Sequence, residues 1–200
     1  MKRVTIKDIA NHLCLSPSTV SRALADDKNI RQETKDIVFK AADDLGYRRN
    51  RLAVSLRSGR TNIIGVVVDQ MVDRSTLHIL AGAERLLHNK GVSMMVANSE
   101  GSHERERDNL TMMNDALVDG MIVAVCDLEK NRDVYLSLKR NGMSLVFLHM
   151  HPQGIIASSV RHADDVESPD YYKLGEKGAE LLLNMLDNPS APTEKVDIEG

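Results

Sequence analysis

Apolar residues recur at helical spacing in three short stretches of the first 45 residues. Intervals of three and four positions place such residues on one face of a helix, and that face packs inward. We therefore expect three short helices around one small core, the third at residues 32–45. The residues expected in this core are Ile6, Ile9, Ala10, Leu13, Val20, Ala23, Leu24, Ile37, Val38, Ala41, Ala42 and Leu45.

Capping residues mark the ends of these helices. Thr5 can cap the first helix, with Asp8 three positions on as its acidic partner. Ser16 can cap the second, whose first position is then Pro17, where a missing N–H costs nothing. Gly46 would end the third. The first two helices are separated by a turn so short that the pair predicts a helix-turn-helix.

The second helix has a distinctive outward face. Ser18, Thr19, Ser21 and Arg22 point away from the expected core, and no acidic residue lies among them. Hydroxyl groups can bind phosphates or base edges, and arginine can bind guanine through two hydrogen bonds. The alternative is an ordinary helical pair with a solvated polar face. The caps, the turn and the basic flanks together favour a helix that reads the major groove.

Residues 47–60 interleave five arginines with apolar residues. Asn50 can cap a short helix that contains Leu52, Ala53 and Leu56. In one interpretation the arginines follow the phosphates while Leu56 enters a base step from the minor groove. In the other, the segment is a tether between domains that orders only on DNA. Both interpretations can hold together.

From residue 62 onward, short apolar runs alternate with amphipathic stretches. We expect strands at residues 63–68, 93–97, 121–125 and 145–148, and helices at residues 77–90, 104–115 and 133–141. Continuous apolar runs are typical of buried parallel strands, and the alternation predicts a doubly wound α/β layer. In the helix at 104–115 we expect Leu110, Met112 and Met113 to face the core, and the charges of residues 104–107 to be solvated.

Ligands of such sheets bind beyond the carboxyl ends of the strands. Polar residues follow several of the expected strands at that edge. They form the candidate pocket for a small-molecule effector: Asp69, Asp73, Ser75, Asn98, Asp127 and His149.

Charge is divided unevenly along the 200 residues, although the net charge is only −3. Residues 1–60 hold 13 Lys and Arg against 7 Asp and Glu, whereas residues 61–200 hold 13 against 22. A basic head on an acidic body directs DNA to one end of the chain. The two cysteines, Cys14 and Cys126, form no disulfide framework, which fits a reducing cytoplasm. We find no signal peptide and no apolar run that could span a membrane, and expect no membrane partner.

Other candidate chemistry is weak. His149, His151 and His162 lack the Cys or Asp spacing of a metal site, and surface histidines are the commoner case. No glycine-rich phosphate loop and no local Ser/His/Asp or Cys/His pairing is present. We therefore expect no metal, no cofactor and no enzymatic activity.

Five segments follow one another in an order that resembles the lactose-repressor/galactose-repressor (LacI–GalR) family of bacterial transcription regulators: residues 5–10, 16–22, 45–47, 50–56 and 64–68. The resemblance implies an all-α helix-turn-helix headpiece at residues 1–47, a hinge helix at 48–61 and a parallel α/β domain of periplasmic-binding-protein type at 62–200. It further implies a sequence-specific regulator, a repressor, that binds a palindromic operator in double-stranded DNA as a homodimer. Such a protein acts in the bacterial cytoplasm, at the nucleoid.

The resemblance also assigns roles by position. Pro17, Ser18 and Arg22 would contact bases, and Ala53 and Leu56 would contact the minor groove. Contacts mainly with the DNA backbone would come from Thr5, Ser16, Thr19, Ser21, Asn29, Thr34, Tyr47 and Asn50.

The chain departs from the family pattern at single positions. Cys14 stands in the turn where Gly or Asn is common and a positive φ is expected, which implies strain of about 1 kcal/mol. Arg31 replaces the usual Ser cap of the third helix, and Arg49 replaces the usual Pro before the hinge helix. His149 stands where the family often carries an acidic sugar-binding residue.

The largest departure concerns the second α/β subdomain. Residues 155–161 resemble the family strand that leads to the crossover between subdomains, and residues 171–183 resemble the family helix that packs back on the first subdomain. Only residues 162–170 separate the two. We expect the second subdomain, and with it half of any effector pocket, to be missing. A natural short paralogue, a pseudogene product and an engineered truncation remain open. So do two other functions: a sensor that binds a sugar or nucleobase, and a non-productive truncated paralogue.

Overall fold

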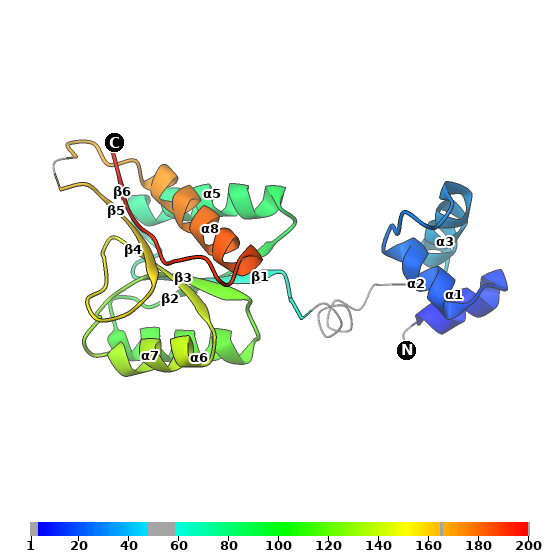
Figure 1. Cartoon of the computed structure of the whole chain (residues 1–200), viewed down its shortest axis with the longest axis horizontal. Helices are drawn as coiled ribbons and strands as arrows, with labels where there is room; N and C mark the ends of the chain where they lie inside the picture. Colours follow the sequence, from blue (N-terminus) through cyan, green and yellow to red (C-terminus); the bar gives the residue numbers. More distant parts are fainter. Residues whose placement is uncertain (1–3, 48–58, 165, 200) are drawn as a thin grey trace. The chain divides into compact units, whose positions relative to one another are not determined.

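The computed structural model describes residues 4–47, 59–164 and 166–199 (Figure 1). The chain divides into two compact units, Met1–Ala53 and Val54–Gly200, each of which is treated by itself. Most of the expected hinge helix, including Asn50, Ala53 and Leu56, lies outside the described residues.

The first unit contains the three expected helices, α1 (Ile6–Leu13), α2 (Pro17–Leu24) and α3 (Gln32–Asp44). Their mutual packing confirms the small core predicted from the apolar spacing. The fully buried members are Ile9, Ala10, Val20, Ala23, Val38, Ala41 and Ala42.

The predicted caps are confirmed. The Thr5 hydroxyl accepts a hydrogen bond from the Asp8 N–H at 3.4 Å, and the Thr5 N–H donates to the Asp8 carboxylate at 2.8 Å, which completes a capping box. Ser16 accepts from the Thr19 N–H at 3.1 Å, with Pro17 at the first position of α2. Arg31 precedes α3 without a side-chain cap.

The inward position of Ile37 was predicted wrongly, because its side chain is 55% exposed. Successive residues of a helix lie 100° apart, so Ile37 falls beyond the edge of the stripe that Val38 and Ala41 define. Lys35 occupies part of that stripe instead and is buried. Its ammonium lies 2.6 Å from a carboxylate oxygen of Asp26, which satisfies the charge at the edge of the core.

Cys14 ends α1 with a φ of 53°, which confirms the left-handed turn conformation expected there. We predict that Cys14→Gly stabilises the headpiece by about 0.5–1 kcal/mol, because glycine adopts this conformation without a Cβ penalty. Hydrogen exchange of the α1 and α2 amides measures the change. Cys14→Ala is the control, since it removes the thiol and keeps the Cβ. An equal gain in both variants would assign the effect to the thiol.

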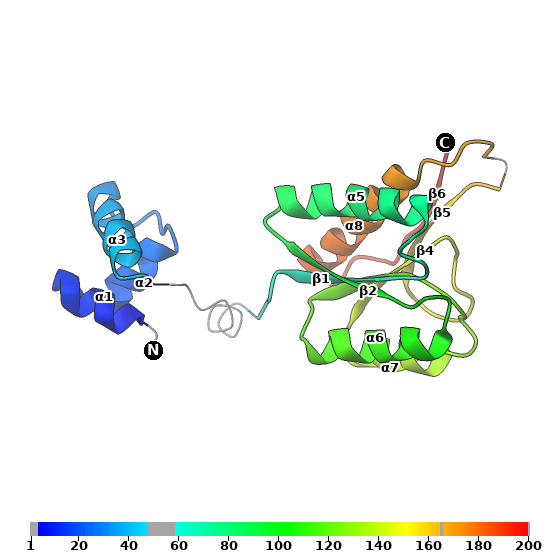
Figure 2. The same cartoon turned by 180° about the vertical axis from the view of Figure 1, so that it is seen from behind.

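The second unit is a doubly wound α/β layer (Figures 1 and 2). Its strands are β1 (Ile63–Val68), β2 (Ser93–Asn98), β3 (Gly120–Ala124), β4 (Ser144–Leu148), β5 (Ser158–His162) and β6 (Lys195–Ile198). Its helices are α5 (Arg74–Asn89), α6 (His103–Asp115), α7 (Arg132–Arg140) and α8 (Tyr171–Asp187). The strands form one parallel sheet in the order β2-β1-β3-β4-β5-β6. Helices α5 and α8 cover one face, and α6 and α7 cover the other.

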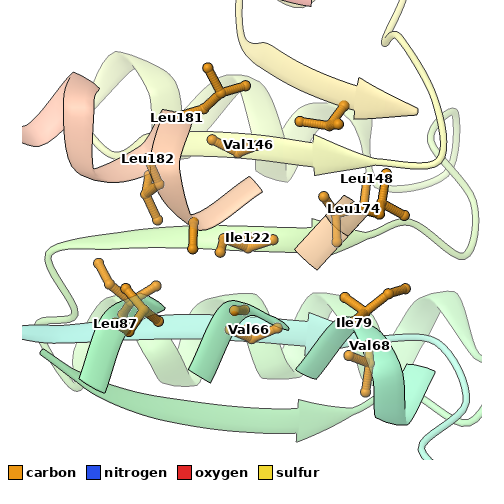
Figure 3. Close-up of a cluster of buried hydrophobic side chains, with 14 of the residues drawn as sticks. Val66, Val68, Ile79, Leu87, Ile122, Val146, Leu148, Leu174, Leu181 and Leu182 are labelled. Carbon is orange, nitrogen blue, oxygen red and sulfur yellow. The ribbon is translucent and has the colours of Figure 1, made fainter. Parts of the chain in front are cut away.

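Apolar residues fill both sides of this sheet. On the α5–α8 side, Leu174 and Leu182 of α8 and Ile79 of α5 pack onto Val66 and Ile122 of the strands (Figure 3). A second cluster lies between the sheet and α6–α7, where the rings of Tyr135 and Phe147 meet edge to face, 5.0 Å apart between centroids. Because both faces are covered, the central strands β1, β3 and β4 are almost entirely apolar, as their sequence indicated, whereas β5 and β6 at one edge carry polar residues.

Two glycines allow the backbones of α5 and α8 to lie in direct contact. A Cβ at Gly175 would lie 1.9 Å from the carbonyl oxygen of Ile79, and one at Gly82 would lie 2.0 Å from that of Tyr172. No larger residue fits either position without moving a helix. The expected return of the last helix onto the first subdomain is thereby confirmed.

The expected α/β elements are all present, with ends shifted by at most four residues. Three details differ. Helix α5 starts at Arg74, so Ser75 lies in its first turn and not in the preceding loop. Met112 is 48% exposed, while Leu110 and Met113 are buried as expected. The C-terminal stretch forms β6, which adds a strand that no apolar run had indicated.

Residues 163–170 connect β5 to α8 directly. All six strands of the described residues belong to the one sheet, and β6 is the strand at its edge, next to β5. None of the helices in the described ranges is long and apolar enough to cross a membrane.

Candidate nucleic-acid interface

The candidate DNA-reading surface is the outward side of α2. Ser18 and Arg22 are exposed there, whereas Thr19 and Ser21 are half-buried. Pro17, at the first helical position, is exposed as well. The structure therefore places one long cationic side chain among short ones, a surface that lets the helix lie close to a nucleic-acid groove.

Three hydroxyl groups are held together at the start of α2. The Ser16 Oγ lies 2.8 Å from the Ser18 Oγ and 2.8 Å from the Thr19 Oγ1. The first N–H groups of a helix have no intrahelical acceptor. Together with nearby hydroxyl groups they can donate hydrogen bonds to a phosphate oxygen. This cluster can bind an anionic backbone without a charged side chain.

The loop between α2 and α3 is held by its own acidic residues. Asp27 accepts from the Asn29 N–H at 2.8 Å and from the Asn29 amide group at 2.9 Å. The backbone hydrogen bond from Asn29 lowers the pKa of Asp27, to which the charges of Arg22 and Lys35 add. Lys35 is buried against Asp26, so its charge is paired within the headpiece.

The other residues expected at the DNA backbone are spread over the headpiece. Thr5 is committed to the α1 cap, where its hydroxyl donates to the Asp8 carboxylate at 2.7 Å. Thr34 lies half-buried on α3, and Tyr47 packs against the headpiece core.

The second candidate site is the carboxyl edge of the sheet. Asp69 and His149 directly follow β1 and β4, and Asn98 ends β2. The Asn98 Oδ1 accepts from the Met71 N–H at 3.1 Å. Asp127 accepts from two backbone N–H groups at 3.1 Å each, and the one from Lys130 is the main cause of its lowered pKa.

The remaining effector candidates have different surroundings. Asp69 accepts a hydrogen bond from the Cys126 thiol at 3.3 Å. Asp73 is the N-terminal cap residue of α5 without a side-chain cap bond, and Ser75 follows within that helix. His149 is exposed and has a φ of 66°. Asp69, Asn98 and Asp127 thus hydrogen-bond with the chain itself, which ties the loops of this edge together.

Glu106 was assigned wrongly to a solvated run, because it is completely buried. Its carboxylate accepts from the Cys126 N–H at 2.6 Å, the Asn131 amide at 2.7 Å and the Tyr135 hydroxyl at 2.6 Å. Burial raises the pKa of Tyr135, and the Glu106 charge raises it further. Helical spacing could have predicted this burial, because Glu106 precedes the buried Leu110 by four positions and so lies on the same face of α6.

His151 also differs from the surface histidine that was expected, because its side chain is largely buried. His151 lies between the Ser159 Oγ at 2.7 Å and an Asp197 carboxylate oxygen at 3.0 Å, a Ser–His–Asp contact that sequence spacing did not indicate. Ser159 is completely buried, so its oxygen is closed to a substrate. Asp197 also binds Arg161 at 2.7 Å, and this contact is the main cause of its lowered pKa. The bonds of Asp197 to His151 and Arg161 therefore hold β6 against the rest of the sheet.

A helix-turn-helix unit followed by a parallel layer of this strand order defines the class of protein: a headpiece joined to an α/β unit of periplasmic-binding-protein type. Residues 5–50 match the family model described as bacterial regulatory proteins, lacI family. The headpiece therefore belongs to the lacI family.

Two curated relatives are transcriptional regulators. The HTH-type transcriptional repressor PurR of Photobacterium profundum is 27% identical over 84% of this chain and 49% of that protein. The HTH-type transcriptional regulator RegA of Clostridium saccharobutylicum is 34% identical over 67% of this chain and 40% of that protein. The chain spans about half the length, or less, of these relatives.

A solved structure shares the fold. A crystal structure of the lac repressor dimer bound to operator and the anti-inducer ONPF has a TM-score of 0.70 and 20% identity. The match covers 99% of this chain and 66% of that one. It confirms the predicted fold class, a helical headpiece followed by a parallel α/β layer.

Proposed function

We propose that this protein is a transcriptional repressor that binds a palindromic operator in double-stranded DNA as a homodimer. The observation that carries the proposal is the α2 surface, where exposed Arg22 stands among short hydroxyl side chains. The repressor names of the PurR relatives and the operator-bound lac repressor dimer support it. The bacterial cytoplasm, at the nucleoid, is the proposed location, and no catalytic role is proposed.

In this proposal Pro17, Ser18 and Arg22 meet base edges in the major groove. The hydroxyl cluster that begins at Ser16 meets the phosphates. Residues 48–61 supply the minor-groove contacts, with Ala53 and Leu56 as the apolar ones.

Arg22 gives the direct test. We expect Arg22→Ala to weaken binding to the selected operator by roughly 1–3 kcal/mol and to relax the preference at one base pair of each half-site. Arg22→Lys keeps the charge but loses the planar fork, so it should keep binding to random DNA and lose the preference. The operator comes from selection among random oligonucleotides, and fluorescence anisotropy measures affinity. Equal losses on operator and random DNA would contradict base reading by Arg22.

A role as a small-molecule sensor is less well supported. Asn98 and Asp127 hydrogen-bond backbone groups of their own loops, and no second α/β layer of the described residues faces them. We therefore propose DNA binding as the primary function, with any effector response secondary to it.

A further inference from the structure

Side chains of the α/β unit hold the three residues that precede β1. Asp119 lies in the turn between α6 and β3, and one of its carboxylate oxygens accepts from the Thr61 N–H at 2.7 Å and the Thr61 hydroxyl at 2.8 Å. The other oxygen accepts from the Asn62 N–H at 2.8 Å. One carboxylate thus fixes two consecutive residues of the arriving chain.

Arg60 is held from another element. Its guanidinium binds the Asp187 carboxylate at the end of α8 at 2.8 Å and also donates to the carbonyl oxygen of Leu186. We call Arg60, Thr61 and Asn62, with Asp119 and Asp187, the linker anchor. It joins residues that are distant in sequence, at the amino end of the sheet and opposite the carboxyl edge.

An open hollow lies beside the linker anchor. A cavity of about 470 Å³ adjoins Gly59, Arg60 and Thr61 on one side and Leu117 and Met143 on the other. Leu117 is 67% exposed. The hydrogen bonds to the Asp119 and Asp187 carboxylates hold Arg60, Thr61 and Asn62 beside this hollow.

We propose that Asp119 is a positioning residue for operator binding, because it fixes the point from which the connection to the headpiece leaves the α/β unit. The inference rests on the proposed function, in which two headpieces of a dimer bind two half-sites. The second headpiece then binds at an effective concentration set by the length and stiffness of the connections. Without the Asp119 bonds, Thr61 and Asn62 are released while Arg60 stays bound to α8, so each connection becomes less stiff and that concentration falls.

The test compares two DNA duplexes, the selected palindrome and a single half-site of equal length. For Asp119→Ala we expect the Kd for the palindrome to rise about tenfold and the Kd for the half-site to stay unchanged. Asp115→Ala is the matched control, since Asp115 is an exposed acid at the end of α6, the helix that precedes the turn of Asp119, and it should leave both affinities unchanged. Hydrogen exchange of the Thr61 and Asn62 amides should be faster in Asp119→Ala alone.

Each outcome decides one question. An unchanged Kd for the palindrome, or equal losses on both duplexes, would overturn the positioning role. If the wild-type protein bound the palindrome no better than the half-site, the proposed dimeric function would fail, whatever the variant did. If Asp119→Ala did not fold, Thr61→Val would be the test, because it keeps the Thr61 N–H bond to Asp119 and removes the two bonds of the hydroxyl, to Asp119 and from the Ile63 N–H. It should raise the Kd for the palindrome about twofold to threefold, with the half-site unchanged.

Discussion

Gly175→Ala should destabilise the α/β unit by about 3 kcal/mol. The added Cβ would lie 1.9 Å from the Ile79 carbonyl oxygen and 2.7 Å from its carbonyl carbon, so helices α5 and α8 must separate. That movement opens the core in which Leu174 packs against the sheet. The better helix propensity of alanine, worth about 1 kcal/mol, does not offset the clash. The loss of stability is measured by urea unfolding, monitored through hydrogen exchange of the β1 and β3 amides.

Gly178→Ala is the matched control on the same helix. Its Cβ would approach the tip of the Leu148 side chain at 2.9 Å, and a side-chain tip can move where a backbone cannot. We expect a stability within about 1 kcal/mol of the wild type, since propensity and contact nearly cancel. Similar losses in both variants would show that helix α8 tolerates no added methyl group, and that backbone contact at Gly175 is not the cause.

Glu106→Leu should cost about 3 kcal/mol in the same measurement. Three buried donors, on Cys126, Asn131 and Tyr135, would lose their acceptor, and each unsatisfied buried group costs roughly 1–3 kcal/mol. Part of this loss is offset, because the desolvation penalty of the buried Glu106 charge is also removed. Tyr135→Phe removes only one donor and should cost about 1 kcal/mol.

Asp108→Leu controls for the change from acid to leucine, because Asp108 is exposed on the same helix. A stability within about 0.5 kcal/mol of the wild type is expected. If Glu106→Leu were as stable as Asp108→Leu, the buried carboxylate would have no role in holding the loop after β3.

Local signals predicted most of the fold. The hydroxyl of Thr5, the acid of Asp8 and the proline at position 17 define helix starts through bonds within a few residues, and these were confirmed. Apolar runs such as residues 63–68 predicted parallel strands, because burial on both faces leaves no polar alternation. The positive φ of Cys14 also followed from its place in a tight turn.

The features that sequence reasoning missed depend on partners far along the chain. Glu106 is buried because Tyr135 and Asn131 reach it from another helix. His151 meets Ser159 and Asp197 only after β6 has joined the sheet. The cost of burying a charge or of placing glycine in a helix depends on such neighbours, and no local pattern specifies them.

The direct connection from β5 to α8 has a consequence for the order of folding. The headpiece is closed by contacts among residues 4–47, whereas β1 and α5 meet α8 only across about a hundred intervening residues. During synthesis the headpiece core can therefore form while the residues of α8 and β6 are still untranslated, and the sheet must wait for them. Until then, the faces of β4 and α5 that α8 covers have no helix against them, and the nascent chain carries a folded headpiece and an incomplete sheet.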